Sequence, residues 1–398
     1  MKYYIKYILQ KLICIVLFPL RIFPIQNNRI LFLSLEGGSS YEYSCNPKYF
    51  CEYLCRERAG QYEMIWLFQK PENYRFLNER GIRTAAYFSL RGLYYALTSR
   101  TVISNGGYLT WFPFRRKQLC INTWHGSGAY KKLENDVAGA NRATRKRMEH
   151  AAKHTAAFLS GCSQFSHHVI RGAFLYDGEI LPIGMPRNDI FFSERKDELY
   201  KTVRKTLGLP DTCRILFYAP TFHSQKDSCE ALDAKMALSE LNRLTGEDWR
   251  LLYRMHIQAE SASPLCGLTD HCVDVSGYPD TQELLCAADW LITDYSSIVW
   301  DFSLMDRPLL LYTPDLDDYC AQRGFYVDIH EWGFPLCRTM EELKHTIHEM
   351  TEGAYIEGPE YHRKLLGSYE TGRSCAALLD YIEGELPGHC VSDSKSVK

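Results

Sequence analysis

The sequence lacks the local motifs that identify several common enzyme classes. It contains no GxGxxG fingerprint and no Walker lysine loop, which argues against dinucleotide oxidoreductases and P-loop enzymes. No CxxC pair occurs, and the nearest approach is Cys51-Glu52-Tyr53-Leu54-Cys55, so a zinc site is not expected. No ligand set for another metal is evident, and whether a divalent ion assists stays open. With a formal net charge of −2, the chain also lacks the excess of basic charge that favours nucleic acid as a partner.

Long apolar runs are missing as well. The most apolar stretch near the start, residues 12–20 (LICIVLFPL), is well short of the roughly 20 residues that span a bilayer. Three lysines precede it, Arg21 follows it, and no small-residue cleavage site comes next. A helix docked on the protein's own core is one interpretation. The pattern favours an amphipathic helix over residues 1–26, lying at an anionic membrane surface on its cytoplasmic face.

Length and cysteine usage set the broad class. A chain of 398 residues is too long for one ordinary core, so two domains are expected. Its fifteen cysteines are an odd number, and several lie in or beside apolar runs, where free cysteine acts as a small hydrophobic residue. A reduced, cytosolic compartment is therefore expected.

Apolar runs of strand length alternate with helical stretches along the whole chain. The expected strands are residues 29–35, 64–68, 83–88, 101–104, 120–123, 157–160, 214–218, 250–254, 272–275, 290–292 and 308–312. A stretch rich in turn formers, residues 181–189, separates two such series. The pattern predicts an α/β protein with two Rossmann-like domains facing a cleft, over residues 27–190 and 191–386, followed by a polar tail at 387–398.

The most informative stretch is residues 288–302. A short apolar strand is followed by the polar sequence Thr293-Asp294-Tyr295-Ser296-Ser297, after which apolar residues return at helical spacing. Ser296 or Ser297 should therefore lie near a helix N-cap. A strand that ends in hydroxyls and opens a helix suits a phosphate group. A plain capped turn is the alternative.

Histidines follow two of the expected strands. His125 directly follows the strand at 120–123, within Thr123-Trp124-His125-Gly126, where it is placed for proton transfer. Arg254 and His256 lie at the tip of the strand at 250–254. Both side chains are costly to bury unpaired, so they suit a phosphate-binding site better than a hydrophobic core. The alternative for His125 is a histidine hydrogen-bonded within its own turn. The alternative for Arg254 and His256 is a plain strand end at the surface.

Five motifs occur together in this chain. They are Thr123-Trp124-His125-Gly126, Gly184-Met185-Pro186-Arg187-Asn188-Asp189, Tyr218-Ala219-Pro220-Thr221, Arg254-Met255-His256 and Thr293-Asp294-Tyr295-Ser296-Ser297. Their combination resembles the CDP-glycerol glycerophosphotransferase family, the wall teichoic acid primases and polymerases. Asp301-Phe302 and several motifs over 307–326 also resemble that family, and the resemblance covers roughly residues 28–385.

The resemblance implies a GT-B-like enzyme that needs no cofactor and binds the inner membrane face peripherally. It would transfer glycerol phosphate from CDP-glycerol to a hydroxyl of a lipid-linked glycan or poly(alditol phosphate) acceptor, releasing CMP. Residues 27–190 would bind the acceptor and residues 191–386 the CDP-linked donor.

The resemblance also implies roles for individual residues. His125 matches the histidine proposed as general base, and His256 matches a second functional histidine near the donor diphosphate. The residues expected to bind substrate are Trp124, Gly126, Pro220, Thr221, Arg254, Thr293, Asp294, Ser296, Ser297 and Asp301.

Two departures from the family pattern border this centre. The family usually continues from its His-Gly pair as Thr-Pro-Leu-Lys, whereas this chain has Ser127-Gly128-Ala129-Tyr130, and Ile257 replaces a proline after His256. The acceptor or the transferred alditol phosphate can therefore differ. CDP-ribitol as donor, a GT-B nucleotide-sugar transferase and a non-catalytic membrane-bound subunit of polymer assembly stay open as alternatives.

Overall fold

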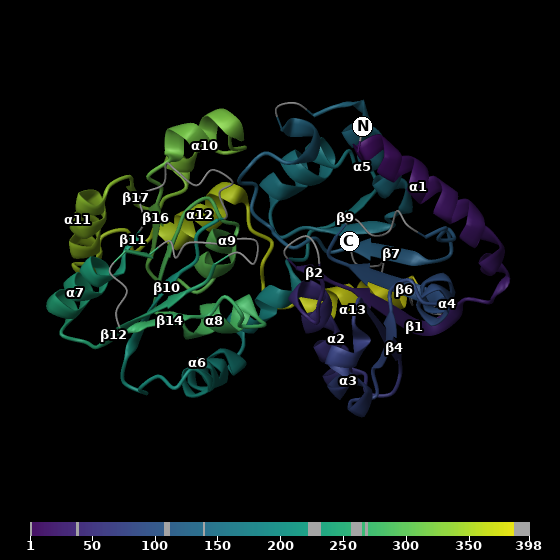
Figure 1. Cartoon of the computed structure of the whole chain (residues 1–398), viewed down its shortest axis with the longest axis horizontal. Helices are drawn as coiled ribbons and strands as arrows, with labels where there is room; N and C mark the ends of the chain where they lie inside the picture. Colours follow the sequence, from purple (N-terminus) through teal and green to yellow (C-terminus); the bar gives the residue numbers. More distant parts are fainter. Residues whose placement is uncertain are drawn as a thin grey trace, which may run out of the picture.

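The computed structural model describes residues 2–36, 40–106, 112–137, 140–221, 232–255, 265–266 and 270–385. Helices and strands form two α/β halves side by side, each built on a parallel sheet covered by helices (Figure 1). The expected class, α/β with two parallel sheets, is therefore confirmed, and each of the eleven expected strands overlaps a strand of the structure.

The first half contains a seven-stranded sheet with the order β5-β4-β1-β6-β7-β8-β9 and parallel pairing throughout. Its strands are β1 (Gln26–Leu33), β4 (Glu63–Phe68), β5 (Arg83–Ala86), β6 (Ser99–Ser104), β7 (Leu119–Asn122), β8 (Ala157–Leu159) and β9 (Glu179–Leu181). Most are short, buried apolar runs, the pattern of a parallel sheet covered on both faces. Since the chain reverses its direction of winding between β1 and β6, a ligand crevice is expected beyond the carboxyl ends of these strands.

The helices of this half cover the sheet, with two minor strands beside it. The helices are α2 (Cys45–Glu57), η2 (Pro71–Tyr74), α3 (Phe76–Glu79), α4 (Leu90–Thr98), η4 (Glu134–Asp136), α5 (Arg142–His154) and the π-helix η5 (Phe165–Ala173). The minor strands are β2 (Leu35–Glu36) and β3 (Ser40–Tyr41).

The second half contains a six-stranded parallel sheet with the order β14-β12-β10-β15-β16-β17. Its strands are β10 (Arg214–Tyr218), β12 (Trp249–Tyr253), β14 (Cys272–Asp274), β15 (Trp290–Thr293), β16 (Leu309–Tyr312) and β17 (Leu336–Cys337), with a minor pair, β11 (Leu232–Asp233) and β13 (Leu265–Cys266). Here the winding reverses between β10 and β15, which places a second crevice beyond their carboxyl ends. The helices are α6 (Arg195–Thr206), α7 (Ala234–Thr245), α8 (Thr281–Ala287), α9 (Ile298–Ser303), α10 (Leu316–Gln322), η7 (Ile329–Glu331), α11 (Met340–Thr351) and α12 (Gly358–Leu366).

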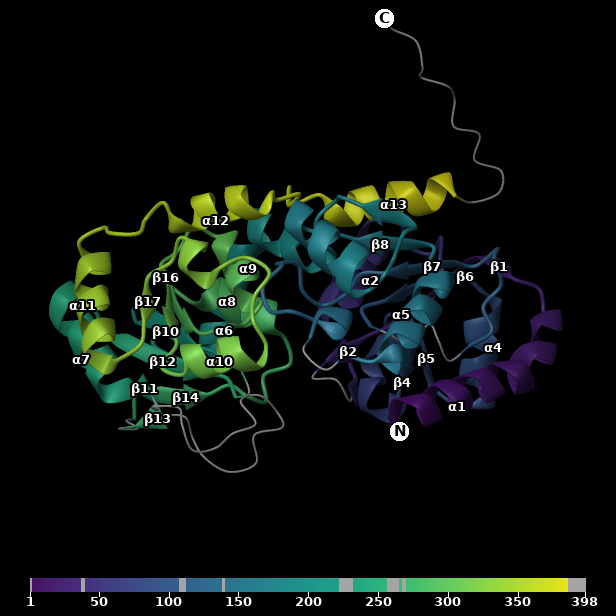
Figure 2. The ribbon, with the colours of Figure 1, turned by 90° about the horizontal axis from the view of Figure 1, so that it is seen from above.

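The chain passes between the halves twice. It leaves the first sheet through η6 (Pro186–Phe192), and after α12 it returns so that α13 (Ser374–Gly384) lies against the first half (Figure 2). The backbone N–H groups of Ser374 and Cys375 donate to the carboxylate of Asp189 at 2.9 and 2.8 Å, which fixes the start of α13. The domain boundary at residue 190 stays a prediction. Although α13 lies within residues 191–386, it packs on the first half.

The N-terminal segment forms α1 (Lys2–Leu17) followed by η1 (Phe18–Ile22). α1 runs along the outer edge of the first half, near α5 at one end and α4 at the other (Figure 1). Nowhere in the described part of the chain is a helix long and apolar enough to cross a membrane.

Candidate active site

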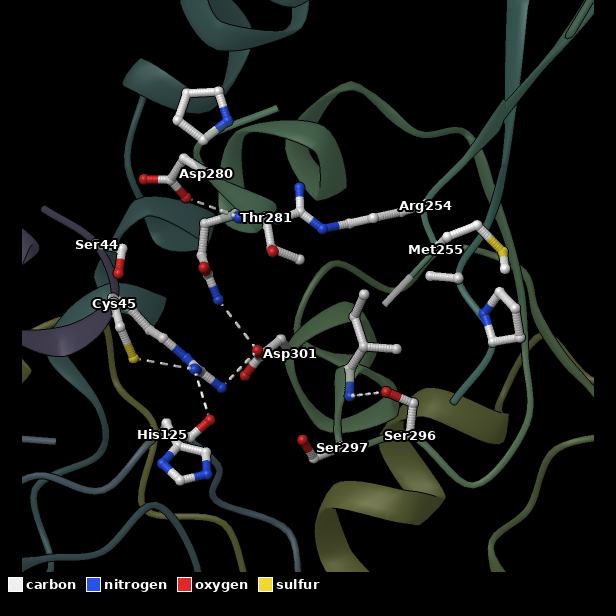
Figure 3. A pocket seen from close by; sticks show the side chains of 16 residues that line it. Ser44, Cys45, His125, Arg254, Met255, Asp280, Thr281, Ser296, Ser297 and Asp301 are labelled. Atoms are coloured by element: carbon white, nitrogen blue, oxygen red, sulfur yellow. Dashed lines mark hydrogen bonds and ion pairs between the residues drawn. The ribbon is translucent and has the colours of Figure 1, made fainter. Parts of the chain in front are cut away.

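A pocket of about 460 Å³ lies between the two halves, at the carboxyl ends of both sheets. Both halves line it (Figure 3). From the first half come Ser44, Cys45, His125 and Arg187, and from the second Ala219, Pro220, Arg254, Met255, Pro279, Asp280, Thr281, Gln282, Ser296, Ser297, Ile298 and Asp301. The pocket therefore joins the two crevices that the sheet topology predicts.

His125 stands in this pocket as a neutral imidazole that can accept a proton. It follows β7, and its Nδ1 lies 3.0 Å from the backbone oxygen of Asn105, which follows β6. Since a carbonyl oxygen only accepts, Nδ1 carries the hydrogen and Nε2 keeps its lone pair. This is the tautomer that a general base requires.

The surroundings of His125 favour its neutral form. The side chain of His125 is exposed toward the pocket opening, so the pocket walls remove it from water only in part. This partial desolvation lowers the pKa of His125, and the positive charges of Arg187 and Lys131 lower it further, while the bond to Asn105 acts in the opposite direction. The indole of Trp124 stacks on the imidazole with ring centroids 4.2 Å apart, and Trp124 has a backbone φ of +50°. A positive φ at a bulky residue is strained and persists only where neighbours impose it.

The acid side of the activity profile should report this lowered pKa. An unperturbed histidine is half protonated near pH 6.5, so the acid limb of kcat/KM should have its midpoint below that value. Replacing Lys131 with methionine removes one positive charge near the ring and should move the midpoint to higher pH. A pH profile of both proteins measures this. A wild-type midpoint at or above 6.5, or a downward shift in K131M, would contradict the electrostatic account.

Ser297, Ser296 and Arg254 line the same pocket from the second half, with Ser297 nearest His125 and Arg254 at the far end of the pocket beside Thr281 (Figure 3). Ser297 is the N-cap residue of α9, as expected, but its side chain makes no capping bond. The Ser296 hydroxyl accepts from the N–H of Ile298 at 3.4 Å. Arg254 directly follows β12 and donates to the backbone oxygen of Tyr278 at 2.7 Å. Because α9 has six residues, its dipole is small, and the hydroxyls and the guanidinium are the stronger anion-binding groups.

The two halves approach closely at this point. A Cβ atom on Gly126, next to His125, would lie 3.4 Å from the hydroxyl oxygen of Ser297. The loop that carries the imidazole therefore passes directly beside the serines at the start of α9. A ligand bound to those serines would be within reach of His125.

Arg187 joins the halves at the pocket wall, and its role was not anticipated from the sequence. Its guanidinium forms a buried ion pair with Asp301 at 2.7 Å and donates to the backbone oxygen of His125 at 2.8 Å. Gln282 also donates to Asp301, at 3.0 Å. Asp301 is thus engaged by protein groups at the pocket wall, and Arg187 links it to the loop of His125.

Asn46, at the start of α2, holds the same loop from the other side. Its amide nitrogen donates to the backbone oxygens of Thr123 and Trp124, and its amide oxygen accepts from the N–H of Arg187. Lys48, two residues later, forms an ion pair at 2.5 Å with Asp280 of the second half. The pocket is therefore held in place by contacts that cross between the halves.

The remaining predicted residues fall into two groups. Thr293 donates to the backbone oxygen of Ala219 at 2.7 Å, and Asp294 accepts from both the N–H and the hydroxyl of Thr221 at 2.6 Å. These bonds tie the loops after β10 and β15 together, and they place Thr293, Asp294 and Thr221 behind the pocket wall rather than in its lining. Pro220 lies in the lining itself.

His256 lies outside the described residues, although Arg254 and Met255 just before it line the pocket. Its assignment stays a prediction. Within the described ranges, no group of three or more histidine, cysteine or carboxylate side chains is arranged to hold a metal ion.

Comparison with known proteins places this site in a family context. The profile of the CDP-Glycerol:Poly(glycerophosphate) glycerophosphotransferase family matches residues 16–384. The teichoic acid poly(glycerol phosphate) polymerase of Bacillus spizizenii is 29% identical over 362 residues, covering 88% of this chain and 90% of that protein. The polymerase of the same name from Bacillus subtilis (strain 168) is 28% identical over 373 residues, covering 90% of this chain and 49% of that protein. This chain therefore spans about half the length of the latter relative.

Solved structures agree with the profile match. The wall teichoic acid polymerase TagF superposes with a TM-score of 0.76 at 26% identity, covering 91% of this chain and 90% of that one. The UDP-GlcNAc 2-epimerase of Neisseria meningitidis has a TM-score of 0.50 at 11% identity, covering 89% of this chain and 100% of that one, which concerns the fold alone. From the extent of the profile match and the likeness to TagF, the chain belongs to the CDP-glycerol glycerophosphotransferase family.

Proposed function

We propose that this protein transfers glycerol phosphate from CDP-glycerol to a hydroxyl group of a teichoic acid acceptor and releases CMP. The observation that carries the proposal is one pocket whose lining includes a base-competent imidazole, His125, from one half and two serines and an arginine from the other. Family membership supports the choice of donor, as does a solved TagF variant soaked with CDPG.

The reaction needs one proton acceptor and one set of phosphate-binding groups. As the acceptor oxygen attacks the β-phosphorus of the donor, Nε2 of His125 takes the hydroxyl proton. A bond forms between that oxygen and the β-phosphorus, and the bond from the β-phosphorus to the oxygen bridging the two phosphates breaks. The electron pair of the broken bond leaves with CMP, whose phosphate then carries the developing negative charge.

The second half supplies the groups that stabilise this charge. Arg254 offers a permanent cation, and the Ser296 and Ser297 hydroxyls can donate to phosphoryl oxygens. Such preorganised donors contribute most where charge develops during transfer. On this account residues 191–386 bind the CDP-linked donor and residues 27–190 present the acceptor to it.

The direct test is incubation with CDP-glycerol, CDP-ribitol and several nucleotide sugars, each with a lipid-linked teichoic acid acceptor. Consumption of CDP-glycerol with release of CMP and an equal amount of extended acceptor is expected. Preference for CDP-ribitol would change the transferred group, whereas release of a nucleoside diphosphate would contradict the proposed reaction. Consumption of none of them with intact protein would favour a non-catalytic subunit.

We further propose that the protein binds the cytoplasmic face of an anionic membrane through α1. Apolar side chains along α1 are exposed, while Gln10 is buried and Lys11 contacts the ring of His150 on α5 at 3.3 Å. The exposed apolar side chains of α1 and the segment after it are Ile5, Ile8, Leu9, Leu12, Ile15, Val16, Phe18, Ile22 and Phe23. An apolar helix face left uncovered by the rest of the protein is what interfacial binding requires. A lipid-linked acceptor would then lie near the enzyme.

Charge on this apolar face should abolish membrane binding. Ile8 and Ile15 are two turns apart and 49% and 69% exposed, so glutamate at both positions places charge at the membrane contact without disturbing the core. Cosedimentation with phosphatidylglycerol vesicles should fall at least tenfold in I8E/I15E, while CMP release with a soluble acceptor is kept. The matched control is Ile356→Glu, an equally exposed apolar residue in the second half. Equal binding by I8E/I15E and wild type would refute the role of α1.

A further inference from the structure

The loop that carries His125 continues across to the second half and is anchored there by Tyr130. The Tyr130 side chain is 3% exposed and packs on Trp332 with ring centroids 4.5 Å apart. Its ring also lies parallel to the ring of His362 on α12, with ring centroids 5.6 Å apart and an interplanar angle of 2°. A Cβ atom on Gly128 would lie 1.9 Å from the Tyr130 ring, so the ring folds back tightly over its own loop.

A directed hydrogen-bond chain fixes the anchor. The Tyr130 hydroxyl lies 2.7 Å from Nε2 of His362, and Nδ1 of His362 lies 2.8 Å from the backbone oxygen of Trp332. Because a carbonyl oxygen only accepts, Nδ1 carries the hydrogen, Nε2 accepts, and Tyr130 is the donor. Burial lowers the pKa of His362 to about 4, which keeps the ring neutral and this direction of bonding in place near neutral pH.

Backbone pairing extends the same junction. The N–H of Tyr326 donates to the backbone oxygen of Tyr130 at 2.8 Å, and the N–H of Lys132 donates to the backbone oxygen of Gly324 at 3.1 Å. Lys131 and Phe325 form an antiparallel bridge between these bonds. The end of the His125 loop is thus fastened to the second half by a short two-stranded pairing and by a buried side chain.

We propose that Tyr130 is a positioning residue that sets the distance between His125 and the donor-binding groups of the second half. Asn105 and Arg187 hold the imidazole and its backbone on the first half, and Tyr130, five residues later, fixes the loop to the half that carries Arg254, Ser296 and Ser297. Any change in the relative placement of the halves therefore acts directly on the loop of the base. This inference rests on the proposed function, because it assigns Tyr130 an effect through His125.

Replacing Tyr130 with phenylalanine tests the anchor. The variant keeps the packed ring and removes the hydrogen bond to His362. Turnover should fall about 10- to 100-fold, as expected when a reacting group is displaced by a fraction of an ångström to 1 Å. The KM for CDP-glycerol should stay within twofold, because the donor-binding side chains are unchanged. Turnover equal to wild type in a folded Y130F protein would overturn the inference.

Two controls separate positioning from general loss of structure. Tyr381→Phe removes a tyrosine hydroxyl away from this junction, one that donates to Glu179 at 2.7 Å, and it should leave turnover within twofold. Turnover of Y130F measured well below its unfolding temperature, where circular dichroism shows a fully folded protein, should stay low. Full turnover at that temperature would show that the effect was on stability alone.

Epistasis with the base completes the test. If Tyr130 acts through His125, adding Y130F to His125→Ala should cause no further loss of residual turnover. Losses that multiply would overturn the inference. Turnover equal to wild type in H125A would overturn the proposed mechanism and this inference together. An inactive H125A beside a fully active Y130F would overturn this inference alone.

Discussion

Replacing His125 with alanine is expected to lower turnover about 10²–10⁴-fold, the usual contribution of a general base. Binding of CDP-glycerol should change by less than threefold, because Arg254, Ser296 and Ser297 belong to the other half of the pocket. Steady-state CMP release and calorimetric titration with CDP-glycerol measure the two quantities separately. In the proposed mechanism the imidazole contacts the attacking hydroxyl, whereas the donor phosphates are held by groups of the other half, which is the physical reason for the split.

A matched control is available on the surface of the second half. His345, on α11, is exposed and contacts only Glu349 at 3.3 Å among the ion pairs of the described residues. His345→Ala should leave both turnover and donor binding unchanged. Turnover within fivefold of wild type in H125A would show that another group removes the proton.

The largest effect on stability is expected from Arg187→Met. Arg187 and Asp301 are 7% and 3% exposed and form an ion pair between the halves. Removing the cation leaves a buried carboxylate with only neutral side-chain donors, Gln282 and Asn188, and breaking such a pair typically costs about 3–5 kcal/mol. The free energy of unfolding, from urea denaturation monitored by circular dichroism, should fall by that amount.

Two further variants show that the loss comes from an unpaired buried charge. Combining R187M with Asp301→Leu removes both charges and should recover much of the lost stability. Arg214→Ala removes a surface arginine that also contacts two carboxylates, Glu247 and Asp289, at 2.9 and 3.0 Å. Because Arg214 is largely solvated, its loss should cost about 1 kcal/mol or less. Equal losses in R187M and R214A would contradict the account of the buried pair.

The parts of the site that follow strand ends were predictable from the sequence. In a parallel sheet all carboxyl ends meet at one edge, so His125 after β7, Pro220 after β10 and Arg254 after β12 fall around a common opening. Ser296 and Ser297 were predictable for the same reason, since they follow β15 and begin a helix. Local sequence therefore suffices where topology alone determines position.

The cross-links between the halves were not predictable in this way. Arg187 and Asp301 are 114 residues apart, and Lys48 and Asp280 are 232 residues apart. Such pairs depend on how the two sheets are placed relative to each other, which no local periodicity records. Arg187 stands within a motif that carries the family resemblance, but a single basic residue in a turn gives no sign of its partner.

Hydroxyls and carboxylates at strand ends are ambiguous for a different reason. Asp294 lies in the same polar stretch as Ser296 and Ser297, yet both of its oxygens accept hydrogen bonds from Thr221. A residue that orders a loop and one that binds a ligand can have the same identity and the same spacing. The substrate-binding roles of Asp294, Thr221, Ser296 and Ser297 therefore stay predictions until a ligand is bound.

The most direct measurement is a crystal structure of the H125A variant with CDP-glycerol. The account predicts the diphosphate in the pocket between the halves, within hydrogen-bond distance of Arg254 and of at least one hydroxyl of Ser296 and Ser297. The β-phosphorus should face the vacated side of residue 125 with room for one acceptor oxygen between them. A donor bound elsewhere, or one whose diphosphate points away from residue 125, would contradict the shared-pocket mechanism.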